Sequence, residues 1–267
     1  MLFGDVEVDI GDDHVATVRF HRPPNNFFDV ALVRSLADAI EALDGDTHCR
    51  AIVLCSDGRH FCAGADLSSP TPGSETDAGT MAGGDGGIVR NPLYTEGVRL
   101  FAGRVPIVAA VQGAAVGGGL GLALVADFRV ASPDARFSAN FARLGFHHGF
   151  GLTVTLPAVI GQQRALELLY TGRRIAGDEA MRIGLCDRLV DADALRAEAH
   201  FFARDIAGSG PLAVRSIRRT MRGDLVERVR TATDNESVEQ ARLRVTNDFE
   251  EGVTAMAERR EPNFTGT

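Results

Sequence analysis

Two glycine-containing segments of the sequence could bind a negatively charged oxygen. The first, His60–Leu67 (HFCAGADL), follows an apolar run that ends at Cys55, and the second, Val116–Leu120 (VGGGL), follows a run that ends at Val111. The second segment also opens a helical pattern, so backbone N–H groups near Gly118 lack intrahelical partners and lie at the positive end of a helix dipole. Such donors bind a phosphate, a carboxylate or a developing oxyanion.

Two other interpretations of these glycines have to be weighed. Neither segment matches the GxGxxG pattern of a dinucleotide-binding unit, and the chain has no lysine to complete a P-loop. Close packing of a helix against a sheet also explains clustered glycines, which make up 30 of the 267 residues, because a residue without Cβ lets two backbones approach. From spacing alone, a packing role and an oxyanion site both remain open.

The charged residues exclude several classes of protein. The 28 basic residues, all of them arginine, stand against 36 acidic ones, giving a net charge of −8. An acidic chain lacks the concentrated basic surface that binds nucleic acid or an anionic membrane. The absence of lysine excludes Schiff-base enzymes, pyridoxal enzymes and Ser-Lys hydrolases, which all need a lysine amine. With no Trp and 2 Tyr, aromatic platforms for single-stranded nucleic acid are not expected either.

The cysteines and the N-terminus predict a reducing compartment. The 4 cysteines form no CxxC pair and have no matching His spacing, so we expect reduced thiols and no metal site. The N-terminal residues show no basic region followed by an apolar stretch, so we expect no secretory signal. A cytoplasmic location is therefore predicted.

Periodicity in the first half of the chain predicts the elements that must position the glycine segments. β-Branched runs separated by Gly11–Asp13 predict a hairpin, and apolar residues spaced by three and four after Asp29 predict a capped amphipathic helix. Residues 105–126 carry no charge over 22 positions, but Pro106 and five glycines divide them into a strand, a turn and a helix rather than a membrane span. The predicted strands are Val6–Ile10, Val15–Phe20, Ala51–Cys55 and Ile107–Val111.

The second half changes from mixed elements to helices. The strands Phe128–Ala131 and Asp187–Val190 and the helices Gln162–Tyr170 and Asp178–Ile183 precede Asp191; beyond it we expect the helices Ala194–Ile206, Pro211–Met221 and Asp224–Glu258. Between Ser68 and Gly87, 16 of 20 residues are Ser, Thr, Pro, Gly or Asp, which predicts a loop beside the site; a domain linker is the alternative. The sequence thus predicts an α/β core of β-β-α units over residues 1–191 and a helical region over 192–267.

Several motifs, in order along the chain, resemble those of the crotonase (enoyl-CoA hydratase/isomerase) superfamily. They are Phe61–Leu67 (FCAGADL), Pro106–Gly119 (PIVAAVQGAAVGGG), Ala126–Asp127, Leu168–Ile175 (LLYTGRRI) and Ala180–Leu185. The resemblance implies a spiral of β-β-α units followed by a C-terminal helical trimerisation region, with trimers often paired into hexamers. It also implies an acyl-CoA thioester as the partner and no cofactor apart from the coenzyme A of the substrate.

The same resemblance implies roles for particular residues. The amides of Ala65 and Gly118 would form an oxyanion hole for the thioester carbonyl, where two fixed donors stabilise the enolate by roughly 3–4 kcal/mol each. Arg22 is the candidate for the 3′-phosphate of CoA, because only arginine can serve in this chain. Phe141, Phe146 and Gly121 would border the acyl group. The residues implied in CoA binding are Arg22, Ala63, Ala65, Asp66, Leu67, Ser68 and Gly118.

The chain departs from the family at its acids. Hydration of an enoyl thioester needs two carboxylates, and counting along the matched segments puts Gly121 and Phe141 at their positions; a third acid position, used by isomerases and a dehalogenase, holds Gly149. A naphthoate-synthase branch has an Asp-Gly pair that resembles His148–Gly149. His148 is therefore the predicted base, with His147 second, since histidine moves protons near neutral pH.

The histidine pair and three acidic residues could have structural rather than catalytic roles. The His pair could be an ordinary surface feature, Glu96 is a third candidate base that could equally be a solvated helix residue, and Asp66 and Asp127 look structural. The leading hypothesis is an enzyme that stabilises an enolate and performs isomerase or hydrolase-type chemistry in preference to hydration. The alternatives are a non-catalytic acyl-CoA binding protein and a hydratase whose acids are not recognised.

Overall fold

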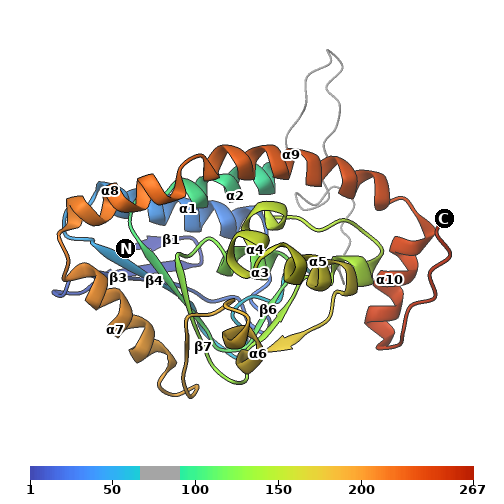
Figure 1. Ribbon diagram of the computed structural model, residues 1–267, viewed down its shortest axis with the longest axis horizontal. Coiled ribbons are helices and arrows are strands. Elements are labelled where there is room, and N and C mark those ends of the chain that lie inside the picture. The colour runs from blue at the N-terminus through green and yellow to red at the C-terminus, as the bar shows by residue number, and fades with distance from the viewer. Residues whose placement is uncertain (67–90) are drawn as a thin grey trace, which may run out of the picture.

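The computed structural model describes residues 1–66 and 91–267 and has the mixed α/β fold that the sequence predicts (Figure 1). Its main sheet has seven strands in the order β1-β2-β3-β4-β5-β7-β10. The first three strands pair antiparallel, and the remaining neighbours pair parallel. The strands are β1 (Leu2–Phe3), β2 (Val6–Ile10), β3 (Val15–Phe20), β4 (Ala51–Ser56), β5 (Ile107–Val111), β7 (Phe128–Ala131) and β10 (Arg188–Leu189).

A second, three-stranded sheet carries the region around the glycine turn. Here β6 (Ala114–Val116) pairs parallel with β8 (Arg136–Ser138), which pairs antiparallel with β9 (Ile175–Ala176). The sequence analysis missed β6 and took these residues for part of a turn. Three residues between two glycines are too few to show an alternating pattern.

Helices cover both faces of the main sheet, because its parallel strands are apolar on both sides. Alternate strand residues such as Val53 and Val108 pack on α7 (Leu195–Ala207) through its Leu195, Ala199 and Ala203. Their neighbours Ile52 and Leu54 face the larger core under α1 (Val30–Gly45) and α2 (Pro92–Ala102). Figure 1 shows α7 on one side of the sheet and α1 and α2 on the other. The Asp29 carboxylate caps α1 by accepting from the Leu32 amide at 2.9 Å, as predicted.

The middle of the chain forms short helices around the glycine turn. The α4 segment was not predicted, since it is almost uniformly apolar and contains Pro157. These helices are α3 (Gly118–Ala123), the 3₁₀ helix η1 (Asn140–Leu144), α4 (Leu152–Ile160), α5 (Gln162–Thr171) and α6 (Gly177–Arg182).

The prediction of a single last helix over Asp224–Glu258 is wrong, because this segment forms two helices. It consists of α9 (Leu225–Leu243) and α10 (Asn247–Glu258). Thr246 has extended backbone angles, and its hydroxyl accepts from the Phe249 amide at 3.2 Å, so it caps a new helix. The break turns α10 back against η1, where Gly145 and Gly252 allow close backbone approach.

The C-terminal helices pack directly on the first part of the chain. Besides α7 under the sheet, α8 (Pro211–Arg222) leads into α9, which packs on α2 and α4 (Figure 1). The division at residues 191/192 stays a prediction. In the described part of the chain, no helix combines the length and apolar character needed to cross a bilayer. The predicted loop Ser68–Gly87 lies outside the described residues.

Candidate active site

A cavity of about 1510 Å³ lies between the glycine turn and the C-terminal helices. Its volume exceeds the roughly 300–1,000 Å³ of an ordinary small-molecule pocket, so a ligand as long as a nucleotide-linked thioester fits. We call the part of its lining formed by Ala63–Asp66 and Gly117–Gly118 the oxyanion wall, and a second part the acyl wall. The acyl wall consists of Tyr94, Phe141, Phe146, Gly149, Phe150 and Gln240.

The oxyanion wall is built from two chain segments that pair with one another. Cys62 pairs in parallel with Ala115, through Cys62 N–H to Ala114 O at 2.9 Å and Val116 N–H to Cys62 O at 3.1 Å. Ala65 and Gly118 each stand three residues beyond this pairing, so the two chains bring them to the same end of the wall. Within residues 1–66 and 91–267, no carbonyl accepts a hydrogen bond from either amide. Among the described residues, nothing competes with an oxyanion for these two amides.

Neighbouring contacts show why these positions are glycine. Gly64 and Gly117 have φ of +95° and +56°, which side chains rarely adopt. A Cβ at Gly118 would overlap the ring of Phe28, and one at Gly119 would overlap the carbonyl of Cys62. The packing role of these glycines is thus present in the structure, and it leaves the predicted oxyanion role open.

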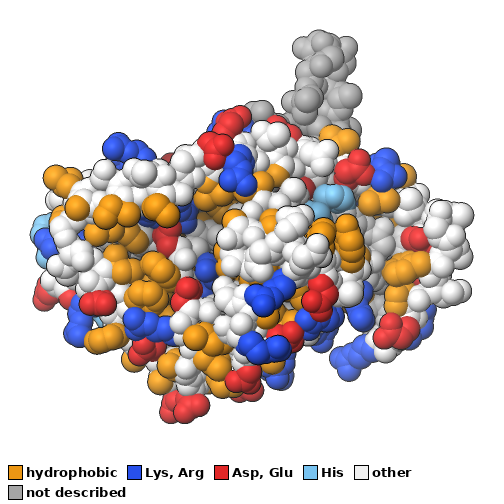
Figure 2. All heavy atoms as spheres, viewed as in Figure 1, with side chains coloured by type: hydrophobic (Ala, Val, Ile, Leu, Met, Phe, Trp, Pro, Cys, Tyr) orange, Lys and Arg blue, Asp and Glu red, His pale blue; other side chains and the backbone are white. Residues whose placement is uncertain are grey.

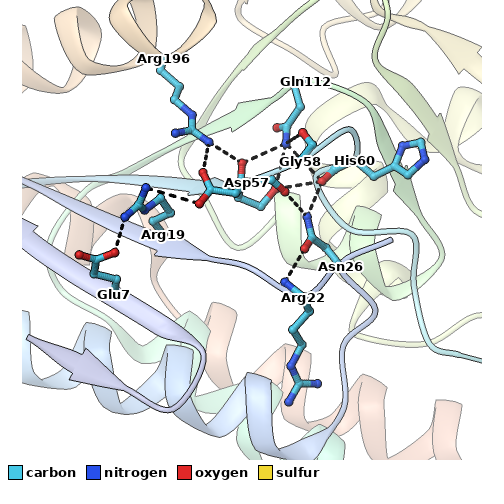
Figure 3. Close-up of polar contacts among 10 residues, drawn as sticks. Glu7, Arg19, Arg22, Asn26, Asp57, Gly58, His60, Gln112 and Arg196 are labelled. Atoms are coloured by element: carbon cyan, nitrogen blue, oxygen red, sulfur yellow. Dashed lines mark hydrogen bonds and ion pairs between the residues drawn. The ribbon is translucent and has the colours of Figure 1, made fainter. Parts of the chain in front are cut away.

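A buried polar network supports the loop that leads into the oxyanion wall (Figure 3). The Asn26 amide donates to the carbonyls of Asp57 and His60, each at 2.7 Å, and its oxygen accepts from the Arg22 amide. From the other side Gln112 donates to the carbonyls of Ser56, Gly58 and His60 at 3.0–3.2 Å. Asn26 is 1% exposed, so its partners are held without competition from water.

The sequence analysis did not find Asn26 or Gln112 as part of the site. In the structure both act on backbone carbonyls. Gln112 lies within the motif Pro106–Gly119 directly after a predicted strand, but Asn26 belongs to no quoted motif. The network is therefore a product of the fold rather than of a local motif.

Comparisons with known proteins agree with this geometry. The family model described as "Enoyl-CoA hydratase/isomerase" matches residues 11–267. The carnitinyl-CoA dehydratase of Proteus mirabilis is 32% identical, covering 94% of this chain and 95% of its own. The crotonyl-CoA hydratase of Syntrophomonas wolfei is also 32% identical, with 95% of each chain covered. The crystal structure of an enoyl-CoA hydratase/isomerase from Pseudoalteromonas atlantica T6c superposes with a TM-score of 0.84 at 29% identity, covering 98% of this chain and 100% of that one.

The chain belongs to the enoyl-CoA hydratase/isomerase family. The crotonase resemblance and the α/β fold with C-terminal helices are confirmed. Members of this family are enzymes that act on acyl-CoA thioesters.

Of the three positions that the sequence analysis matched to the family's acids, the two glycines have no room for a side chain unless their neighbours move. A Cβ at Gly121 would lie 2.7 Å from the Phe150 ring, and one at Gly149 would lie 2.7 Å from Gln240 Nε2 and overlap the Tyr94 hydroxyl. Phe141 lines the cavity with its ring, 5.4 Å from that of Phe146. Gly121, predicted to border the acyl group, is covered by Phe150 and does not line the described cavity.

The predicted bases His147 and His148 lie behind the acyl wall rather than on it. Neither lines the cavity as far as the described residues define it. The His148 Nε2 atom is 2.8 Å from the Thr153 hydroxyl, which itself donates to Glu236 at 2.6 Å. Burial, with a smaller contribution from His147, lowers the pKa of His148 to about 4. This placement does not support His148 as the base, and its contacts indicate a structural role.

Glu236 is the centre of this second buried network. Its carboxylate is fully buried on α9 and accepts hydrogen bonds from the amides of Gly151 and Thr153, at 2.8 and 3.1 Å. Burial raises its pKa, and the Thr153 and Gly151 donors oppose that rise. The carboxylate thereby holds the start of α4 and the loop that carries Phe150.

The other predicted charges are also engaged away from the cavity. Glu96 pairs with Arg34 and Arg99; burial raises its pKa, but the two arginines outweigh this and hold it below the ordinary range. Asp127 accepts from the Ile107 amide at 2.8 Å and pairs with Arg218, which confirms the structural role expected from the sequence.

Only some of the residues predicted to bind CoA line the cavity. Ala63, Ala65, Asp66 and Gly118 line the cavity, whereas Leu67 and Ser68 lie outside the described residues. Arg22 does not line the described cavity, because it pairs with Asp5 at 2.6 Å and Asp29 at 2.8 Å. The arginines that do line it are Arg59, Arg136, Arg174, Arg244 and Arg259.

The acyl wall contains two polar side chains that the sequence analysis missed, Tyr94 and Gln240. The Tyr94 hydroxyl donates to Gln240 Oε1 at 2.8 Å, and Gln240 Nε2 donates to the carbonyl of His147 at 3.0 Å. Burial, together with the nearby Glu236, raises the pKa of Tyr94, so the phenol keeps its proton. The two residues are 146 positions apart, so no local pattern could have joined them.

Proposed function

We propose that the protein binds an acyl-CoA thioester with the thioester oxygen at the amides of Ala65 and Gly118, and that it stabilises the enolate formed there. The observation that carries this proposal is that Ala65 and Gly118 follow the Cys62–Ala115 pairing by the same number of residues and that, among the described residues, no carbonyl accepts from their amides. Removing a Cα proton places negative charge on the thioester oxygen, and fixed donors in an enclosed site are worth more than in water.

The reaction we favour is isomerisation of a double bond or a hydrolytic step rather than ordinary hydration. Hydration uses one carboxylate to activate water and another to deliver a proton. Phe150, Phe141 and Tyr94 occupy the space of the three matched acid positions, which supports this preference. The names of the relatives, mostly hydratases and dehydratases, make direct assay of hydration the necessary comparison.

The test is exchange of the Cα hydrogens in D2O, measured by mass spectrometry for a panel of saturated and unsaturated acyl-CoA thioesters. Deuterium at Cα of a bound thioester is expected. Binding without exchange or turnover for every thioester would contradict enolate chemistry and support the alternative, a non-catalytic acyl-CoA binding protein. Rapid loss of the crotonyl-CoA enoyl absorbance would contradict the preference against hydration while leaving the oxyanion site intact.

We also propose that the chain assembles as a homotrimer or a hexamer. Large apolar side chains remain exposed on the C-terminal helices, with Leu212 83%, Ile217 62% and Met221 80% exposed on α8. Figure 2 shows apolar atoms on the surface over this helix. Contiguous apolar surface of this kind is typical of an interface. Light scattering on the purified protein measures the mass, and a monomer at all concentrations would contradict the proposal.

A further inference from the structure

The Tyr94–Gln240 pair is a polar feature in an otherwise apolar part of the acyl wall. Its neighbours on that wall include Phe28, Phe141 and Phe150. Tyr94 is 7% exposed and Gln240 6% exposed, and burying polar groups costs free energy unless each is hydrogen-bonded. Gly149 accommodates the pair, because any side chain there would collide with both residues.

The carbonyl of His147 determines which group donates and which accepts in the Tyr94–Gln240 hydrogen bond. The His147 carbonyl can only accept, so the Gln240 amide nitrogen must face it and Oε1 must face Tyr94. The single phenolic hydrogen is therefore donated to Gln240. What the Tyr94 oxygen retains is acceptor capacity, because its bond to Gln240 uses the hydrogen and no lone pair.

We propose that Tyr94, oriented by Gln240, is a specificity residue that accepts a hydrogen bond from a hydroxyl group on the acyl chain of the thioester. The inference rests on the proposed function, since it assumes that the acyl group lies along the acyl wall. A hydroxyl can donate to the free lone pair, whereas an oxo group, which only accepts, would meet another acceptor. The preferred substrates are hydroxyacyl-CoA thioesters over their oxo and unsubstituted counterparts.

The experiment compares matched four-carbon thioesters that differ only in this oxygen. The dissociation constants of butyryl-CoA, 3-hydroxybutyryl-CoA, 4-hydroxybutyryl-CoA and 3-oxobutyryl-CoA are measured by competition with a fluorescent CoA derivative. At least one hydroxy thioester is expected to bind about tenfold more tightly than butyryl-CoA, the size of one neutral hydrogen bond. Equal affinity of butyryl-CoA and both hydroxy thioesters would overturn the inference.

Two variants and a control test which residue is responsible. Tyr94→Phe removes only the oxygen, so the hydroxy-to-unsubstituted affinity ratio should fall to about one. Tyr170→Phe changes the chain's other tyrosine, which is 74% exposed, and should leave the ratio as it is. Gln240→Leu frees the phenolic hydrogen, so the oxo thioester should gain affinity relative to butyryl-CoA. A ratio unchanged by Tyr94→Phe would overturn the assignment.

Failure of this inference can be told apart from failure of the proposed function. If no thioester binds, the acyl-CoA proposal itself is wrong. If thioesters bind and exchange at Cα but show no hydroxyl preference, only the role of Tyr94 is wrong. Thermal unfolding of each variant establishes that it is folded, and Tyr94→Phe alone decides the outcome if Gln240→Leu does not fold.

Discussion

The two walls of the cavity differ in whether backbone or side-chain groups form them. The oxyanion wall is backbone: two chain segments paired at Cys62 and Ala115, with glycine where contact is closest. The acyl wall is side chains from α2, the loop before α4 and α9, held by hydrogen bonds over long sequence distances. A backbone site needs particular glycines and a particular pairing, whereas a side-chain site changes with each substitution. The first type of wall suits a feature common to all thioesters, and the second suits the variable acyl group.

The largest expected effect tests whether the backbone wall works through its N–H groups. Gly118 is the first residue of α3, a position where proline is tolerated, but a side chain there would meet the Phe28 ring. In a Phe28→Ala background, Gly118→Pro removes the amide hydrogen and should lower Cα exchange by roughly 10²–10³-fold, the usual cost of one oxyanion donor.

The matched control in the same background is Gly118→Ala, which adds a side chain but keeps the N–H. Its exchange rate should remain near that of Phe28→Ala alone. Equal rates for the Pro and Ala variants, measured by deuterium uptake, would show that this amide does not bind the oxyanion.

The next effect concerns the support of the acyl wall and its dependence on pH. The pKa of His148 falls from an ordinary value near 6.5 to about 4 on folding, because the ring is buried. Between pH 6.5 and pH 4 the unfolded chain binds a proton at His148 that the folded chain does not. The free energy of unfolding is therefore highest above pH 6.5 and falls as the pH is lowered toward 4. The loss amounts to roughly 3 kcal/mol at most.

His148→Gln isolates this contribution, since a glutamine amide can still donate to the Thr153 hydroxyl. Urea unfolding from pH 4 to 8 should show wild-type stability falling relative to the variant as the pH is lowered. A constant difference between the two proteins across this range would mean that His148 titrates normally.

A smaller effect compares the two buried networks directly. Asn26→Leu takes the hydrogen-bond partner from the Asp57 carbonyl and the Arg22 amide behind the oxyanion wall. Glu236→Leu takes it from two amides and a hydroxyl behind the acyl wall. Each should cost about 1–3 kcal/mol of unfolding free energy, the penalty of unsatisfied buried groups.

The functional consequences of these two substitutions should differ. Asn26→Leu should lower Cα exchange for every thioester alike, whereas Glu236→Leu should change the order of preference among acyl groups. Unfolding curves and exchange rates for the same panel provide both readouts. The same change in acyl preference from both variants would contradict the separation of the two walls.

This division also explains how much the sequence could predict. The glycine turn near Gly118 could be recognised as a candidate anion site because a strand followed by a glycine turn and a helix start is a local pattern with a local geometry. The choice of Ala65 and Gly118 as the two donors came from the family resemblance and stays a prediction. The network of Asn26 and the pair formed by Tyr94 and Gln240 depend on which distant segments the fold brings together. His148 shows the same limit, because its residue type suited proton transfer but its direction was set by contact with Thr153 and Glu236.

The smallest expected effect concerns the phosphate end of the ligand, where the predicted arginine and the observed cavity disagree. Arg22 is engaged by Asp5 and Asp29, whereas Arg59 and Arg174 line the cavity. Exposed charge pairs contribute about 0.5–1 kcal/mol each, so Arg59→Gln and Arg174→Gln should each weaken binding of free CoA by roughly threefold. Salt should reduce this difference, because exposed charges are screened. Arg22→Gln is the matched control, and titration calorimetry at two salt concentrations measures the affinity of all three variants for CoA. A loss of affinity confined to Arg22→Gln would restore the sequence-based prediction. CoA would then have displaced both carboxylates from the Arg22 guanidinium.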